Sequence, residues 1–195
     1  MTRLTLEKPL AFIDLETTGI SVGSDRIVEI AILKINPDGS KTSRVHRVNP
    51  EMPISEESIG IHGISNEDVA TEPTFTDLAP SLFKFLFDCD LAGYNSNKFD
   101  IPMLVEEFYR AGIEFDFADR KKVDVQNIFH RMEQRTLVAA YRFYCNKEIE
   151  NAHSALDDIT ATYEVLEAQL EKYSELKTDV DFLEEFSRYH HTADL

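Results

Sequence analysis

The sequence predicts an α/β fold in which helices flank one mixed β-sheet, and three observations lead to this prediction. The first part of the chain reads as three short strands joined by turns, which is typical of an antiparallel meander. Strand and helix patterns alternate in the middle of the chain, as they do in sheets covered by helices. An amphipathic pattern over residues 153–173 then predicts a long helix with one face on a core.

The strands are predicted from alternating apolar residues bounded by turn residues. The segment Asn36-Pro37-Asp38-Gly39 supplies the turn between the second and third strands. The first three strands form the meander, and the fourth follows a strong helix, so the sheet is expected to be mixed. The predicted strands are residues 10–16, 26–35, 43–48 and 91–94.

Apolar residues at helical spacing predict the helices. Short helices are expected over residues 56–61 and 66–70, and longer ones over residues 75–88, 100–111 and 153–173. In the last helix, one apolar face is expected to pack on the core. Its residues are Leu156, Ile159, Tyr163, Leu166 and Leu170.

The chain of 195 residues, 43% of them hydrophobic, is long enough for one domain with a sizeable core. We expect this domain over residues 1–173 and a C-terminal helical tail over residues 174–195. The tail has a small amphipathic pattern of its own, formed by Val180, Leu183 and Phe186. It is expected either to pack back on the domain or to dock a partner.

Charge and cysteine content limit the possible functions. The net charge of −16 argues against broad binding along a nucleic-acid backbone, which depends on clustered Lys and Arg, and suits a protein that gathers divalent cations. Most of the acidic residues are nevertheless expected to form a solvated surface. The two cysteines, Cys89 and Cys145, have neither zinc spacing nor the density of a disulfide scaffold. Neither a membrane span nor a signal peptide is apparent, so we expect a cytoplasmic protein.

The first chemical motif lies at the end of the first strand. Alternation along a strand places Asp14 and Glu16 on the same face, beside the apolar Ile13 and Leu15. Two like charges at the end of an apolar strand are costly unless a hard divalent cation neutralises them. The alternative is that both are plain solvent-facing carboxylates.

The second motif is the turn over residues 93–100, between the fourth strand and the helix that follows it. Strand-to-helix junctions lie at the sheet edge where α/β proteins bind ligands, which makes Asp100 a candidate site residue. Because Asp100 stands just before Pro102 in a first helical turn, it also resembles an N-cap residue. The two roles are not mutually exclusive.

The third motif is the start of the last long helix. A neutral imidazole, here that of His153, can take a proton from water near pH 7. The alternative is an exposed residue at a helix start. Asp157 and Asp158 both lie off the apolar face, so periodicity does not choose between them.

The three segments resemble, in this order, the Exo I, Exo II and Exo III motifs of the DEDDh 3'-5' exonucleases. This DnaQ-like family contains the proofreading epsilon subunit of bacterial DNA polymerase III. The Ile-His-Gly-Ile segment at residues 61–64 is similar to a further family element, and the resemblance extends over about residues 10–170. The residues that match the three motifs are Asp14 and Glu16, then Asp100, then His153 with Asp158.

This resemblance implies a ribonuclease H-like fold, in which two further strands extend the meander to a five-stranded sheet. It implies that Asp14, Glu16, Asp100 and Asp158 bind two divalent cations, Mg²⁺ or Mn²⁺, and that His153 is the general base. It also implies that four residues lie against the terminal nucleotide and that Asn95 supports the site. These four residues are Thr17, Thr18, Gly19 and His62. For Thr17, Thr18 and Gly19, the alternative is an ordinary strand-ending turn.

The function implied is hydrolysis of phosphodiester bonds at the 3' end of single-stranded nucleic acid, DNA rather than RNA, in proofreading or repair. A DNA polymerase subunit is the protein partner that the resemblance implies. An RNA-trimming exoribonuclease of the RNase T or oligoribonuclease kind is the alternative, because the family uses the same carboxylates on both substrates. A non-catalytic polymerase-binding module and a two-metal phosphatase are further alternatives. A weaker hypothesis assigns guidance of the strand to Arg120, Lys121, Lys122, Arg131 and Arg135.

Overall fold

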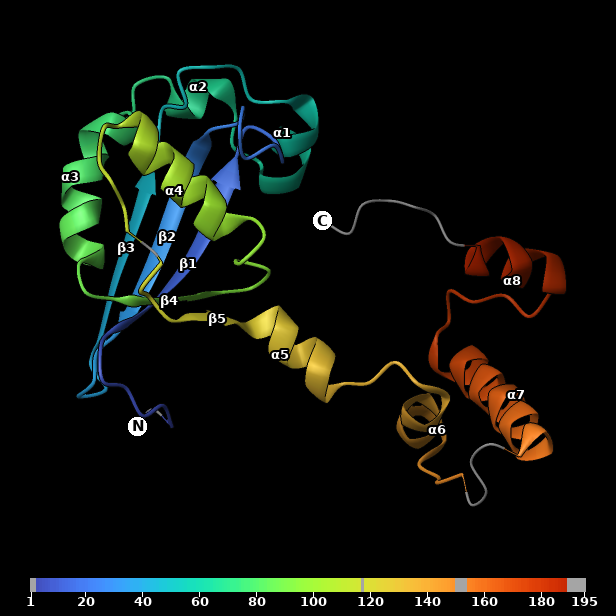
Figure 1. Cartoon of the computed structure of the whole chain (residues 1–195). Coiled ribbons are helices and arrows are strands. Elements are labelled where there is room, and N and C mark those ends of the chain that lie inside the picture. The colour runs from blue at the N-terminus through green and yellow to red at the C-terminus, as the bar shows by residue number, and fades with distance from the viewer. Residues whose placement is uncertain (1–2, 117, 150–153, 189–195) are drawn as a thin grey trace. The chain divides into compact units, whose positions relative to one another are not determined.

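The computed structural model describes residues 3–116, 118–149 and 154–188. The chain forms two compact units, residues 1–129 and residues 130–195, and each is described here by itself (Figure 1). No helix within the described ranges is long and apolar enough to span a membrane.

A five-stranded mixed sheet forms the centre of the first unit (Figure 1). Its order is β3-β2-β1-β4-β5, in which β1, β2 and β3 pair antiparallel and β4 and β5 run parallel to β1. This confirms the predicted meander, its extension to five strands and the mixed sheet. The strands are β1 (Leu10–Thr17), β2 (Ile27–Ile35), β3 (Lys41–Arg47), β4 (Asp90–Gly93) and β5 (Lys122–Asp124).

Four helices of the first unit begin at the residues where the sequence places helix starts. Ser55, Ser65 and Thr74 each accept a hydrogen bond from a backbone N–H of the first turn that follows them. Two of the longer helices bury apolar residues of the main core, in which Leu82 and Phe108 are fully buried. These helices are α1 (Glu56–His62), α2 (Asn66–Val69), α3 (Phe75–Leu86) and α4 (Asp100–Arg110). A fifth helix, α5 (Val125–Met132), begins in the first unit and ends in the second.

A buried carboxylate attaches α4 to the meander. Glu107 is 1% exposed, and its Oε1 accepts hydrogen bonds from Arg26 Nε at 2.8 Å and from the Ile27 N–H at 3.1 Å. One turn later, Arg110 donates to the carbonyls of Gly23 and Asp25. These bonds fix the loop between β1 and β2 against the helix, so the conformation of the loop depends on α4.

The second unit consists of α6 (Leu137–Cys145), α7 (Ala155–Lys172) and α8 (Val180–Ser187). Tyr141 of α6 packs on Ala161 and Val165 of α7, and its hydroxyl donates to Glu164 at 2.8 Å. This buried face of α7 is not the apolar face that the sequence predicted to pack on a core. Four residues of the predicted face are exposed. These are Leu156, Ile159, Tyr163 and Leu166. Within its unit, α7 therefore packs through small residues that periodicity of large apolar residues did not identify.

The burial of Glu107 leads to a stability prediction. Replacing Glu107 with Ala leaves Arg26 and the Ile27 N–H without their acceptor, and removing one partner of a buried ion pair costs about 3 kcal/mol or more. Urea unfolding should show this loss. Glu106→Ala is the control, because this neighbouring glutamate makes only a partly exposed pair with Arg110 at 3.4 Å and its loss should cost about 1 kcal/mol or less. Equal losses in the two variants would contradict the assignment.

Candidate active site

Asp14 and Glu16 lie on the face of β1 away from the main core. The residues on either side of them, Ile13, Leu15 and Thr17, are buried, whereas Asp14 is exposed and Glu16 half-buried. The strand alternation predicted from the sequence therefore holds. The two carboxylates are near enough for the charge of Asp14 to raise the pKa of Glu16.

Asp100 reaches β1 from the first turn of α4. Its Oδ1 accepts a hydrogen bond from the Leu15 N–H at 3.2 Å, which places the carboxylate beside the backbone that joins Asp14 to Glu16. The capping interpretation of Asp100 is wrong, because Asp100 is the first helical residue and the N-cap is Phe99, which makes no side-chain capping bond. The Asp100 side chain is 6% exposed and accepts a hydrogen bond from β1 instead of capping the helix.

The electrostatics of this cluster favour a bound cation. Burial raises the pKa of Asp100 to about 6, and the negative charges of Asp14 and Asp124 contribute to that rise. Burial also raises the pKa of Glu16; Asp14 and Glu29 raise it further, and His62 opposes them. Carboxylates that are costly to ionise together are stabilised by a divalent cation with a preference for oxygen ligands. The donor set therefore fits such a cation.

The turn after β1 is held by its own threonines. The Thr17 hydroxyl donates to the Gly19 carbonyl at 2.6 Å, and the Thr18 hydroxyl donates to Asp25 Oδ1 at 2.8 Å. A Cβ at Gly19 would lie 2.7 Å from Asp25 Oδ2, so only glycine fits there without movement. These contacts agree with the strand-ending turn for both threonine side chains.

His62 of α1 is held by backbone atoms on both ring nitrogens. The Ile64 N–H donates to Nδ1 at 3.0 Å, so the ring proton lies on Nε2, which donates to the Thr17 carbonyl at 3.2 Å. The ring is therefore fixed beside the end of β1, next to Glu16. Contact of His62 with a nucleotide stays a prediction.

The third motif belongs to the second unit. Asp158 lies in the first turn of α7, and His153 falls outside the described residues. Asp157, the other candidate aspartate, lines a hollow of about 470 Å³ with Tyr141 and Lys147 of the same unit. Among the described residues, no three His, Cys, Asp or Glu side chains lie close enough together to hold a metal ion. The structure brings Asp14, Glu16 and Asp100 to one end of β1, although these described side chains do not by themselves form a complete metal site.

Two buried carboxylates near this site were missed by sequence reasoning, Glu107 and Asp124. Glu107 follows Asp100 by two helical turns and so shares its helix face, which is a signal that the sequence contains. Asp124 ends a strand of three residues, too short for periodicity to reveal.

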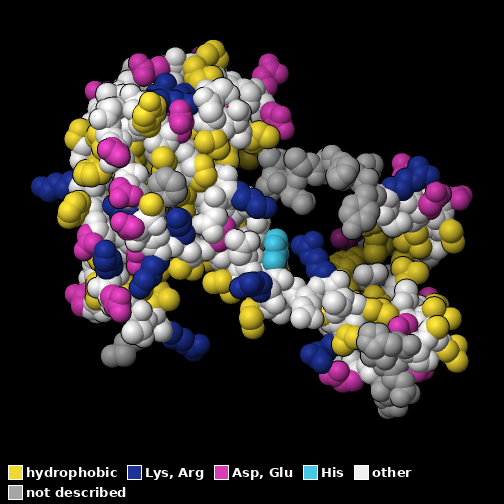
Figure 2. Space-filling model, in the orientation of Figure 1, with side chains coloured by type: hydrophobic (Ala, Val, Ile, Leu, Met, Phe, Trp, Pro, Cys, Tyr) yellow, Lys and Arg dark blue, Asp and Glu magenta, His cyan; other side chains and the backbone are white. Residues whose placement is uncertain are grey.

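Arg120 does not fit the hypothesis of strand guidance. Its guanidinium donates to the carbonyls of Leu86, Cys89 and Asp116, which fixes it at the start of β5, away from the end that carries Asp124. On the face of the first unit seen in Figure 2, Lys and Arg side chains lie scattered among acidic ones.

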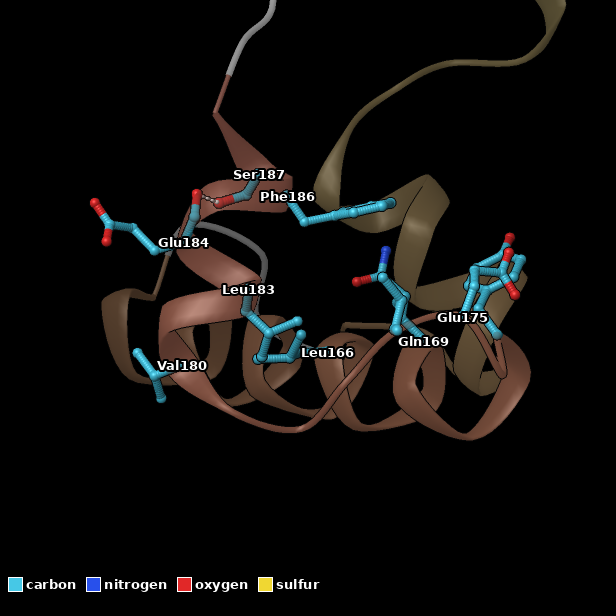
Figure 3. Close-up of a pocket in the computed structure, with 10 residues that line it drawn as sticks. Leu166, Gln169, Glu175, Val180, Leu183, Glu184, Phe186 and Ser187 are labelled. Carbon is cyan, nitrogen blue, oxygen red and sulfur yellow. Dashed lines mark hydrogen bonds between the residues drawn. The ribbon is translucent and has the colours of Figure 1, made fainter.

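A larger hollow of about 620 Å³ lies between α7 and α8 (Figure 3). Its lining is mainly apolar, with Leu166, Val180, Leu183 and Phe186 among its residues, and the carboxylates of Glu175 and Glu184 lie at its edge. This lining offers no cation to a phosphate. The carboxylates at the end of β1 are therefore the better candidates for phosphate chemistry.

Comparison with known proteins decides the family. The sequence profile of the RNase T exonuclease family matches residues 11–166, a span that contains all three motifs. The chain belongs to this exonuclease family. Among its relatives, a DNA polymerase III of PolC type from Caldanaerobacter subterraneus is 26% identical over 173 residues, which are 88% of this chain and 12% of the relative.

Two further relatives of this exonuclease domain are epsilon subunits or similar to them. The DNA polymerase III subunit epsilon of Buchnera aphidicola is 26% identical over 159 residues, 78% of this chain and 62% of that protein. An epsilon-like protein of Rhodobacter capsulatus is 32% identical over 156 residues, 77% of this chain and 22% of that protein. The chain thus spans only part of the length of each relative.

Solved structures of Escherichia coli exonuclease I share the fold. A complex with a dT13 oligonucleotide has a TM-score of 0.60 and 19% identity, and the match covers 92% of this chain and 43% of that chain. A zinc-bound form of the exonuclease I complex with single-stranded DNA has a TM-score of 0.59 and 17% identity, over 87% of this chain and 42% of that chain. The exonuclease family generally uses divalent metal ions, in agreement with the donor set at β1.

The raised pKa of Asp100 predicts a pH-dependent stability in the absence of metal. The folded state holds the proton more tightly than the unfolded chain, so the free energy of unfolding should fall as pH rises from 3.8 to about 6. Asp100→Asn removes this cost and keeps an acceptor for the Leu15 N–H. Urea unfolding in EDTA should show a gain of roughly 1–3 kcal/mol at about pH 7.5 and none at about pH 4.

Asp77→Asn is the control for this prediction, because hydrogen bonds from Thr74 lower the pKa of Asp77. It should reduce stability at neutral pH, the opposite direction. Destabilisation by Asp100→Asn at neutral pH would show that the ionised carboxylate is already compensated by the protein alone.

Proposed function

We propose that this exonuclease domain hydrolyses the phosphodiester bond at the 3' end of single-stranded DNA. One observation carries the proposal: Asp14 and Glu16 share an open face of β1, and the buried Asp100 is bonded to the backbone between them. These carboxylates, two from β1 and one from α4, lie at the end of β1, where the resemblance places three of the four metal ligands. The family match over all three motifs supports the assignment.

In this proposal, Asp14, Glu16, Asp100 and Asp158 hold two Mg²⁺ or Mn²⁺ ions. Such ions would supply positive charge to the phosphate and its leaving oxygen and would favour ionisation of water. His153 takes the proton of the attacking water as general base. The proposal requires Asp158 and His153 to act on the same phosphate as the β1 carboxylates, and the resemblance in order and spacing supports that requirement.

The turn at residues 17–19 and His62 are proposed to form the wall against the terminal nucleotide. The hydrogen bonds of Thr17, Thr18 and His62 make this wall rigid before substrate arrives. A rigid wall lowers the entropic cost of orienting the scissile phosphate. Asn95 belongs to the loop that leads to Asp100 and supports the site from that side.

The proposed substrate is a short single-stranded end rather than a long duplex, because the net charge of −16 disfavours broad backbone binding. Structures of exonuclease I with bound oligonucleotide share the fold, and supporting relatives are polymerase III proteins. We therefore also propose a DNA polymerase subunit as protein partner.

A time course on 5'-labelled single-stranded DNA and RNA of equal sequence tests the proposal. With Mn²⁺ or Mg²⁺, the DNA should shorten from its 3' end as a ladder and faster than the RNA. EDTA or Asp14→Ala should abolish the ladder, because either removes the cation or one of its ligands. Asp88→Ala is the control, since this exposed aspartate pairs with Lys8.

Each other outcome identifies an alternative. A faster RNA ladder would assign the domain to the exoribonucleases, since the 2'-hydroxyl is the local difference between the substrates. Cleavage of nucleotide monoesters alone would indicate a phosphatase. Intact DNA and RNA with every metal, together with stable partner binding, would make the domain a binding module.

A second prediction concerns the general base. His153→Ala should lower kcat by roughly 10²- to 10⁴-fold while cation binding persists, because the imidazole accepts a proton and is not a proposed ligand. Single-turnover hydrolysis measures the rate. His46→Ala on β3 is the control and should retain full activity. An unchanged rate in the His153 variant would reassign the base.

A further inference from the structure

Asp124 is buried at the end of β5, directly beside the fourth strand. It is 6% exposed and pairs in register with Gly93, the last residue of β4. No ligand, catalytic or substrate role was assigned to it by the motifs. A buried carboxylate is costly unless donors compensate for its charge, so its partners decide its role.

Those partners are backbone N–H groups from two directions. Asp124 Oδ1 accepts from the N–H of Gln126 at 3.1 Å and of Asn127 at 3.5 Å, which caps the N-terminus of α5. The same oxygen accepts from the Asn95 N–H at 3.0 Å, and Oδ2 accepts from the Asn97 N–H at 3.1 Å. The cap needs only the first pair, so the second pair serves the loop.

The loop held in this way leads directly to Asp100. Asn95 has a φ of 59°, a left-handed conformation that costs energy in a residue other than glycine. Ser96 is fully buried, and its carbonyl accepts from the Ile101 N–H at 2.9 Å in the first turn of α4. Asp124 thus holds both sides of Ser96, and Ser96 holds the start of the helix that carries Asp100.

The loop also packs closely on β1. A Cβ placed on Gly93 would lie 2.6 Å from the Ser96 Cβ and 2.9 Å from the Ile13 carbonyl, so no larger residue fits between them. Ile13 precedes Asp14. A shift of the loop would therefore move Asp100 relative to Asp14 and Glu16.

We propose that Asp124 is a positioning residue of the cation site: through the Asn95 and Asn97 N–H groups it fixes the loop that sets Asp100 against β1. Its oxygens face backbone donors, so it does not act as a ligand. The expected effect of Asp124 variants on hydrolysis rests on the proposed function. Their expected effect on cation affinity does not.

Asp124→Ser separates the two roles of the carboxylate. Serine is a good N-cap residue and keeps α5 capped, but its single hydroxyl cannot replace the two loop bonds. We expect Mn²⁺ affinity, followed by electron paramagnetic resonance of free Mn²⁺, to fall roughly tenfold or more. In hydrolysis, kcat should fall while KM for the oligonucleotide stays within about threefold, because the loss concerns the cation site.

Asp90→Ser is the matched control. Asp90 lies at the other end of the same strand pair, where its Oδ1 accepts from the Lys121 N–H at 2.9 Å. This variant loses a similar carboxylate-to-backbone bond, yet it should leave Mn²⁺ affinity and kcat unchanged. Equal effects of the two variants would reduce Asp124 to a structural residue and overturn the proposal.

Asp124→Asn distinguishes position from charge and serves if the serine variant does not fold. It removes the charge, as serine does, but keeps one side-chain acceptor for the loop. If Asp124 acts by positioning, Asp124→Asn should lose less Mn²⁺ affinity than Asp124→Ser. If only Asp124→Asn folds, it should bind Mn²⁺ more weakly than the wild type. Equal losses in both would indicate charge alone and overturn the proposal. Unchanged affinity in a folded Asp124→Ser variant, or in Asp124→Asn if only that variant folds, would also overturn it.

Failure of the proposed function gives a different result. A wild-type protein that binds Mn²⁺ but cleaves no oligonucleotide refutes the hydrolytic function, and the positioning role is then judged on affinity alone. A wild-type protein that binds no Mn²⁺ refutes the positioning role itself.

Discussion

The site depends on one hydrogen bond, from the Leu15 N–H to the carboxylate of Asp100. On one side, β1 pairs with β2 along its whole length, but its parallel pairing with β4 ends at Phe12. Beyond that point the Leu15 N–H has no strand to bond with on the β4 side, and a buried N–H requires a partner. Asp100 supplies it from α4. The backbone's need for an acceptor thus places a carboxylate beside the stretch of backbone that joins Asp14 to Glu16.

This arrangement explains why α4 is held so firmly. Asp100 and Glu107 lie two turns apart on the helix, and each accepts a backbone N–H from the sheet, from Leu15 and Ile27 respectively. Two such bonds fix the position of the helix along β1 and β2 as well as its distance from them. Apolar packing alone would allow a helix to slide, because it is non-directional. A cation site built from two elements requires the stricter arrangement.

Sequence patterns predicted β1 to β4, α1 to α4 and α7 within a few residues, because alternation and helical spacing depend on local burial. They gave no bounds for β5, α5 or α6, which are short. They also placed Asp14 and Glu16 on one face, which follows from the geometry of a single strand. They could not choose between the roles of Asp100, since its acceptor function depends on a strand 85 residues away in the chain. Asp124 was missed for the same reason: its partners Asn95 and Asn97 belong to another loop. Local patterns identify candidates, whereas roles depend on contacts distant in sequence.

The three buried carboxylates of the first unit differ in how well the protein compensates their charge. Glu107 pairs with Arg26 and accepts the Ile27 N–H, and Asp124 accepts N–H groups from both the loop and α5. Asp100, in α4, accepts one N–H group from β1, and its burial, together with the negative charges of Asp14 and Asp124, raises its pKa to about 6. The charges of Glu107 and Asp124 are therefore largely compensated within the fold, although Glu107 Oε2 is buried without a hydrogen-bond partner among the described residues, while Asp100 retains a demand for positive charge. That residual demand, at the one carboxylate that lies against Asp14 and Glu16, is the physical basis for binding a cation there.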